Sequence, residues 1–144
     1  MCGRFALNRA LGQLRANLNV RRVNTNGRTF VPSNNIAPGS TVPTVMNQEM
    51  NLFLWGIENM GKTHPFFRCE GITKTRPEDI KERRCVVPVD GYFEWCKAHG
   101  DNQPYFFANK NGDLLFLAAV YSTSGRFALL TRDATKQVTN IHDR

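Results

Sequence analysis

Short apolar segments separated by turn residues dominate this chain from residue 44 onward, and this pattern limits the fold more than any other feature. Residues 44–46 and 51–57 flank a short polar turn and predict a β-hairpin. Residues 85–89 predict a buried strand, in which Pro88 indicates an edge position or a bulge. Residues 91–95 continue that strand with alternating polarity.

The pattern of short strands extends into the last third of the chain. Residues 105–107 and 114–121 predict two strands, and the Asn-Gly sequence within residues 109–113 favours a hairpin turn between them. Ser124-Gly125 predicts another turn, which leads into a strand at residues 127–131. A sheet built this way is mainly antiparallel and curves around one core.

Helical signals are few and lie near the two ends. The leucines at 7, 11, 14 and 18 recur on one helical face, and Asn8 is a candidate N-cap. Residues 135–142 predict a short helix capped by Thr135. Residues 20–42 read as a long polar loop of the kind that often carries function, and residues 58–84 show no clear pattern. We therefore expect an α+β fold: one domain over residues 1–144, with a barrel-like, mainly antiparallel sheet and a few helices.

Positive charge is concentrated in the first third of the chain. The net charge is +7, and residues 1–48 contain six arginines and no acidic residue. A localised positive segment is a candidate surface for a polyanion, although a solvated surface explains the charge equally well. No apolar run approaches the length of a membrane span, and the N-terminus lacks the apolar core of a signal peptide.

The four cysteines do not form a metal or disulfide pattern. They are spaced 67, 16 and 11 residues apart without a Cys-x-x-Cys motif, and the three histidines stand at no zinc-finger spacing from them. We expect no metal and no cofactor. With no secretion signal, we expect reduced thiols in an intracellular compartment, either cytoplasm or nucleus.

Cys2 is chemically distinctive because of its position. Methionine aminopeptidases usually remove Met1 when residue 2 is small, which would give Cys2 both an α-amine and a β-thiol. The amine, with a reference pKa of about 8, can attack an aldehyde to form an imine. The thiol can then close on the imine carbon to give a five-membered thiazolidine. The same two groups suit N-terminal acyl transfer, and an incidental cysteine is the simplest alternative.

Two further side chains are candidates for proton transfer. Glu94 stands between Phe93 and Trp95, and alternation places it on the same strand face as Tyr92. A carboxyl at a partly dry site tends to have a raised pKa, which prepares a general acid near neutral pH. His142 follows an apolar residue and can act as a proton shuttle. The alternatives are a glutamate on a solvent face and a surface histidine.

Seven motifs in the same order resemble the SRAP family, the SOS response-associated peptidases. They are residues 1–6 (MCGRFA), 35–39 (NIAPG), 55–56 (WG), 89–95 (VDGYFEW), 103–107 (QPYFF), 116–123 (FLAAVYST) and 141–144 (IHDR). The first and fourth are the most specific, and the resemblance runs from one end of the sequence to the other.

The resemblance implies an abasic-site sensor for single-stranded DNA. In this family the aldehyde of the open-chain abasic sugar reacts with the processed N-terminal cysteine, which corresponds to Cys2, and the thiazolidine crosslink protects the lesion. By resemblance Glu94 and His142 handle protons. The DNA-binding candidates are Arg4, Asn35, Trp55, Lys74 and Arg76. We expect a monomer that acts away from membranes.

Two departures from the family pattern shape the alternatives. The family usually has Asn-Ala-Arg-x-Glu where residues 74–78 read KTRPE, so that Lys74 replaces an amide that places the abasic sugar. Family members also usually continue beyond the His-Asp-Arg motif. The alternative functions are a non-covalent single-strand binder and a thiol autopeptidase that removes Met1. Scattered basic residues with aromatic neighbours favour single-stranded over double-stranded DNA.

Overall fold

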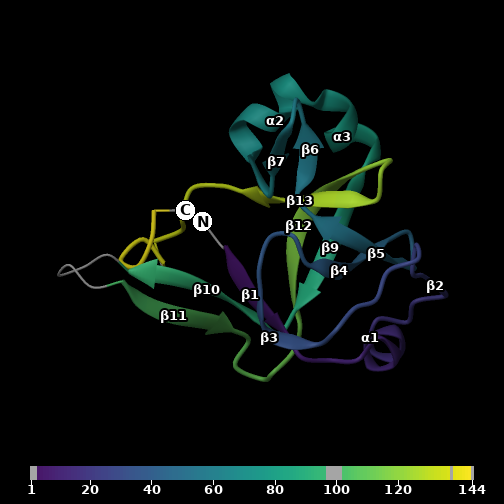
Figure 1. Ribbon diagram of the computed structural model, residues 1–144. Coiled ribbons are helices and arrows are strands. Elements are labelled where there is room, and N and C mark those ends of the chain that lie inside the picture. The colour runs from purple at the N-terminus through teal and green to yellow at the C-terminus, as the bar shows by residue number, and fades with distance from the viewer. Residues whose placement is uncertain (1–2, 97–101, 137, 144) are drawn as a thin grey trace.

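A closed five-stranded barrel forms the centre of the molecule (Figure 1). The computed structural model describes residues 3–96, 102–136 and 138–143. The barrel strands are β4 (Thr41–Met46), β5 (Glu49–Trp55), β9 (Arg84–Val89), β12 (Leu115–Ser122) and β13 (Arg126–Thr131). Neighbouring strands are antiparallel except where β13 runs parallel to β5 and closes the barrel, with Phe127 opposite Trp55. Two short strands, β2 (Arg22–Asn24) and β8 (Phe66–Arg68), extend the sheet.

The sequence of the β4–β5 connection explains its tight turn. Asn47 and Gln48 both have positive φ angles, 49° and 61°, as a two-residue turn with the twist of a hairpin requires. Inside the barrel, the ring of Trp55 lies 4.8 Å from that of Phe5 and 6.1 Å from that of Phe127, centre to centre. All three side chains are fully buried, so they anchor the main core.

A second sheet packs beside the barrel in the strand order β11–β10–β1–β3. Its strands are β11 (Gln103–Ala108), β10 (Gly91–Cys96), β1 (Arg4–Leu7) and β3 (Ser33–Ile36). The chain passes from barrel to second sheet between Val89 and Gly91. A Cβ at Gly91 would collide with the ring of Phe106 and the carbonyl of Phe107, so this crossing requires glycine.

Three short helices in the described part of the chain lie outside the sheets. Helix α1 (Leu11–Asn17) follows β1, and α2 (Cys69–Thr75) and α3 (Pro77–Glu82) sit above the barrel together with β6 (Ile57–Asn59) and β7 (Lys62–His64) (Figure 1). A small apolar cluster beneath α2 and α3 fixes them. Its buried members are Ile57, Ile72, Val120 and Ala128. No helix in the described part of the chain has the length and apolar character needed to cross a membrane.

The expected α+β, barrel-like, mainly antiparallel fold is confirmed, but one predicted hairpin is wrong. β11 pairs with β10, and β12 pairs with β9 and β13, so the two strands predicted to form a hairpin belong to different sheets. The Asn-Gly turn does form, with the Gly112 N–H donating to the carbonyl of Asn109 at 3.0 Å. A turn signal fixes only the local bend, and the buried faces of the strands decide their partners.

Four local predictions also differ from the structure. Leu7 lies in β1, and α1 begins only at Leu11 with Ala10 as its N-cap, because the N–H of Asn8 is held by the carboxylate of Asp90 at 2.6 Å. Pro88 is not at an edge, since β9 lies between β4 and β12. The described residues of 135–142 form hydrogen-bonded turns instead of a helix, and the polar segment 20–42 contains β2 and β3.

Candidate active site

Glu94 is buried in the middle of β10, with only 5% of its surface exposed. Its strand neighbours Phe93 and Trp95 point to the opposite face, as the alternation predicted, so Glu94 shares its face with Tyr92. Burial raises the pKa of Glu94, because a charged carboxylate loses solvation there. The charge of His142 acts in the opposite direction on this pKa, and that of Asp143 adds to the rise.

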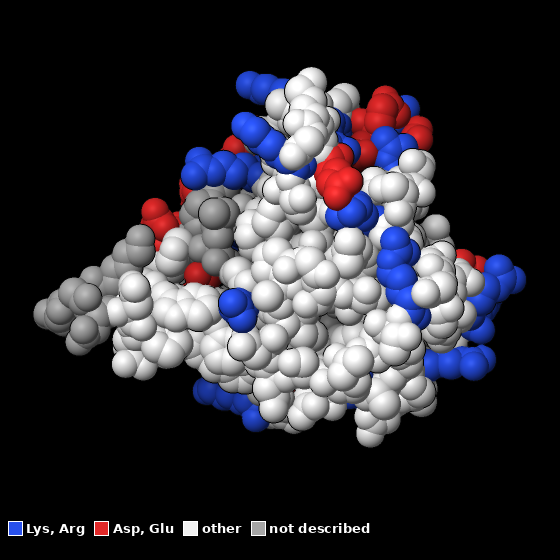
Figure 2. Space-filling view, in the orientation of Figure 1, with Lys and Arg blue, Asp and Glu red and all other residues white. Residues whose placement is uncertain are grey.

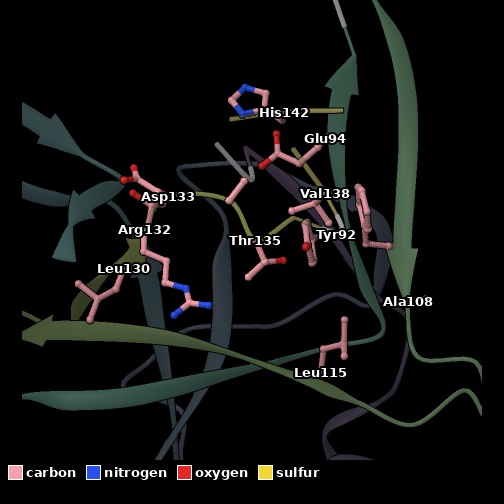
Figure 3. Close-up of a pocket in the computed structure, with 13 residues that line it drawn as sticks. Tyr92, Glu94, Ala108, Leu115, Leu130, Arg132, Asp133, Thr135, Val138 and His142 are labelled. Atoms are coloured by element: carbon pink, nitrogen blue, oxygen red, sulfur yellow. The ribbon is translucent and has the colours of Figure 1, made fainter. Parts of the chain in front are cut away.

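A cavity of about 470 Å³ opens in front of Glu94, and we call it the Glu94 cavity (Figure 3). Its walls come from β10, β11, β12, the end of β13 and the C-terminal segment. The residues that line it are Tyr92, Glu94, Phe107, Ala108, Leu115, Leu130, Thr131, Arg132, Asp133, Ala134, Thr135, Val138 and His142. Apolar side chains lie around the few titratable groups, an arrangement typical of sites that perturb a pKa.

The C-terminal segment brings His142 to the same cavity. Its backbone N–H donates to the carbonyl of Val138 at 3.0 Å, and the N–H of Ala134 donates to the carbonyl of Asp143 at 2.9 Å. These bonds fold the segment back on itself beside β10. The imidazole Nδ1 of His142 lies 3.0 Å from a carboxylate oxygen of Asp143. Glu94 and His142, which the sequence named as separate candidates for proton transfer, therefore line one cavity (Figure 3).

Arg4 and Asn35 also lie together, on the other face of the second sheet. Arg4 stands opposite Phe93 in the β1–β10 register, and Ile36 stands opposite Phe5 in the β1–β3 register. Residues opposite each other in the register share a sheet face, and successive residues of a strand alternate between faces. Arg4 therefore shares the face of Phe93, and Asn35, the neighbour of Ile36, lies on that face too. Both are directed away from the face that carries Glu94. The guanidinium of Arg4 donates to the side-chain oxygen of Asn35 at 3.0 Å.

Lys74 and Arg76 lie on the helical layer above the barrel, and neither lines the Glu94 cavity. Lys74 is exposed in the last turn of α2. Arg76 joins α2 to α3, its Nε donates to the buried carboxylate of Asp79, and its guanidinium lies 5.1 Å from the ring centre of Phe67. Arg76 is thus held by the protein itself while keeping 24% of its side chain exposed.

Trp55 cannot act as a DNA-contacting side chain in this structure. It is fully buried, and its indole N–H donates to the carbonyl of Pro65 at 3.0 Å. The predicted contribution of Trp55 to the strand-binding surface is therefore corrected to a role in the barrel core.

The arginines of the first third do not gather around the candidate site. Arg4 lies beside β10. In contrast, α1 and β2 lie at the other side of the molecule (Figure 1), where further basic side chains are exposed (Figure 2). Arginines that are close together in the first third of the sequence are therefore not gathered at the Glu94 cavity.

Sequence reasoning missed Arg132 and Asp133, which line the Glu94 cavity directly after β13. A polar pair at the end of a buried strand was the available signal, because such positions often carry function. Cys2 lies outside the described residues. The described cysteines, Cys69, Cys85 and Cys96, are free thiols, and burial raises the pKa of Cys85 to about 12. Among the residues the structure describes, no group of three or more His, Cys, Asp or Glu is close enough to hold a metal ion.

Comparison with known proteins connects this arrangement to a family. The sequence matches the family described as SOS response associated peptidase (SRAP) over residues 1–144. It is 27% identical over 162 residues to abasic site processing protein YedK of Escherichia coli, covering 100% of this chain and 73% of that protein. It is 26% identical over 133 residues to abasic site processing protein YMR114C of Saccharomyces cerevisiae, covering 80% of this chain but only 36% of the yeast protein.

Solved structures share the fold. A protein from Bacteroides thetaiotaomicron superposes with a TM-score of 0.83 at 18% identity, over 97% of this chain and 72% of that chain. A phage-related protein from Bordetella bronchiseptica gives a TM-score of 0.72 at 25% identity, over 99% of this chain and 75% of that chain. The family match over the full sequence, together with the named abasic site processing relatives, leads to one conclusion: this chain belongs to the SRAP family of abasic site processing proteins.

Proposed function

We propose that this protein binds single-stranded DNA at an abasic site and joins it covalently through Cys2. The observation that carries the proposal is the buried Glu94, whose pKa is raised by burial and which shares a cavity with His142. A carboxyl with a raised pKa and an imidazole in one cavity are side chains of the kinds that transfer protons in catalysis.

The chemistry proceeds in two steps once Met1 has been removed. The α-amine of Cys2 attacks the aldehyde carbon of the open-chain sugar, and loss of water leaves an imine. Glu94, protonated, donates the proton that lets the hydroxyl leave as water. The thiol sulfur then adds to the imine carbon while its proton passes to the nitrogen, which gives the thiazolidine. A reducing compartment keeps that thiol available.

The short sequence distance from Cys2 to β1 is compatible with the proposed pairing of Cys2 with Glu94. Arg4 stands opposite Phe93, the residue directly before Glu94. Only Gly3 separates Arg4 from Cys2, and two residues of chain span at most about 7 Å. In the sequence, Cys2 is therefore two residues from β1, the strand that pairs with β10.

Positive and polar groups around the second sheet and the helical layer would hold the strand. Arg4 and Asn35 offer one polar pair, and Lys74 and Arg76 offer two more cations. We assign phosphate contacts to Arg4, Lys74 and Arg76, because sequence-independent binding depends chiefly on such charges. Lys74 supplies a cation where the family usually has an amide.

The decisive experiment is incubation with abasic single-stranded DNA followed by a denaturing gel. A shifted band is expected with protein whose intact mass shows that Met1 is absent, and Cys2→Ala should abolish it. Cys69→Ser is the matched control, because it removes a half-buried thiol from α2 and should keep the band. The thiol step is isolated by Cys2→Ser, which should form an imine trapped by borohydride but no stable adduct.

Absence of the shifted band with correctly processed protein would overturn the covalent mechanism. Salt-sensitive DNA binding without an adduct would then indicate a non-covalent single-strand binder. Retention of Met1 by Cys2→Ala, with removal in the other variants, would indicate that Cys2 also acts in self-processing.

A further inference from the structure

A second cleft lies at the opposite end of β12 and β13 from the Glu94 cavity. Its volume is about 430 Å³, and we call it the Arg28 cleft. It is lined by Asn26, Arg28, Asn51 and Phe53 together with residues 121–125 of the β12–β13 hairpin. Leu115 belongs to the first cavity and Tyr121 to the second, so the two sites are separated by six residues of strand, roughly 20 Å.

Among the described residues that line the cleft, Arg28 is the only charged one. It is half-buried, and among the described residues no carboxylate lies within ion-pair distance of its guanidinium. The guanidinium of Arg28 donates a long hydrogen bond from Nη1 to the carbonyl of Leu52, at 3.5 Å. Other arginines differ: Arg9 is paired with Asp90, Arg22 with Glu49 and Arg126 with Glu58. A half-buried cation without a carboxylate favours an anion from solution.

The backbone is shaped around this guanidinium. Gly125 has a φ of +72°, and a Cβ there would lie 3.0 Å from Nη1 of Arg28. Glycine thus permits both the turn and the close approach of the arginine. The site for the guanidinium is formed by the fold itself and does not depend on a flexible surface side chain.

Neutral donors surround the same space. The side-chain oxygen of Asn51 accepts a hydrogen bond from Asn24 at 3.1 Å. The side-chain N–H groups of Asn51 therefore point away from Asn24. The hydroxyls of Ser122 and Ser124 lie 2.8 Å apart at the hairpin. One arginine with amide and hydroxyl donors, and no carboxylate among the described lining residues, has the chemistry of a phosphate site.

We propose that the Arg28 cleft binds a phosphate group and is a second anion site, separate from the Glu94 cavity. The phosphate belongs either to a DNA strand that continues past the lesion or to a free phosphorylated compound. The first of these alternatives rests on the proposed function.

The first test is a titration of isotope-labelled protein with inorganic phosphate, followed by amide chemical shifts. Shifts are expected at Asn51, Ser124 and Gly125, and Arg28→Gln should remove them. Arg21→Gln is the matched control, because it removes the same charge from an exposed position outside the cleft lining and should preserve the shifts.

The second test separates the two phosphate sources. Binding of undamaged single-stranded DNA of about 16 nucleotides is measured over a range of salt concentrations. If the strand reaches the cleft, Arg28→Gln should weaken binding about fivefold at about 0.1 M salt and reduce the salt slope by about 0.7, the effect of one lost phosphate contact. Phosphate shifts without this change would assign the cleft to a free phosphorylated compound.

A variant that keeps Arg28 guards against misfolding. Ser124→Asp places a carboxylate in the cleft and should block phosphate, whereas Asn111→Asp makes the same charge change on a turn outside the lining. The proposal is overturned if Arg28→Gln and Arg21→Gln behave alike toward both phosphate and DNA. Crosslinking of the unchanged protein to an abasic oligonucleotide of about 4 nucleotides is scored separately. Its failure would reject the proposed function and leave the phosphate result standing.

Discussion

Glu94 and Asp79 are both buried carboxylates, with 5% and 3% of their surfaces exposed, yet their surroundings differ. Asp79 lies on α3 between two arginines: the Nε atoms of Arg76 and Arg83 donate to its two oxygens, the latter at 2.7 Å. Glu94 lies on a strand and faces a cavity, where burial raises its pKa. Asp79 with its two arginines, Arg76 and Arg83, forms a structural clamp, whereas a buried carboxyl beside an open cavity suits the proton donor proposed for Glu94.

The largest predicted effect concerns Glu94, the buried carboxyl that faces the cavity. Glu94→Gln keeps the shape of the side chain but removes its titratable proton, so crosslinking to abasic DNA should slow about 100-fold, as expected for loss of a general acid. The rate is measured from the appearance of the shifted band under single-turnover conditions.

Glu82→Gln provides the control for this measurement. It makes the same chemical change at an exposed carboxylate of α3 and should leave the crosslinking rate unchanged. An equal rate for Glu94→Gln and the unchanged protein would show that burial of Glu94 has no part in proton transfer.

The next largest effect concerns the clamp that Asp79 forms with Arg76 and Arg83. Asp79→Asn removes the charge shared by Arg76 and Arg83, which are 24% and 28% exposed and can partly regain water. The free energy of unfolding should fall by about 2 kcal/mol, below the usual cost of breaking a fully buried pair. Chemical denaturation measures this loss, and Glu82→Gln is again the matched control. A loss as small as that of Glu82→Gln would show that the clamp does not stabilise the helical layer.

The sequence predicted the placement of Glu94 better than that of Asp79. Strand alternation places Glu94 on the face of Tyr92 from five consecutive residues, and that inference needs no knowledge of distant parts of the chain. The clamp depends on how α2 and α3 meet at Arg76, in a region where residues 58–84 showed no clear pattern. Asp79 therefore gave no signal of burial before the structure.

Long-range placement accounts for the other differences. Trp55 resembled a surface residue by motif, but the parallel pairing of β13 with β5 buries it in the barrel. Arg132 reaches the Glu94 cavity because the chain after β13 returns toward β10. Likewise, five of the six N-terminal arginines follow β1 in the sequence, and the elements there, α1 and β2, lie on the other side of the molecule from the C-terminal segment (Figure 1). Each outcome depends on strand order, which local patterns do not encode.

The smallest effect tests the raised pKa of Glu94 through stability. The folded state holds the Glu94 proton more tightly than the unfolded state, so Glu94 favours folding below its ordinary pKa and this contribution is lost as pH rises through the raised folded pKa. Gln does not titrate. The stability of Glu94→Gln relative to the unchanged protein should therefore increase with pH across this range and then level off. Denaturation at a series of pH values measures the difference, with Glu82→Gln run in parallel. A difference that stays flat, or that falls with rising pH, would show that the surrounding charges outweigh burial at Glu94.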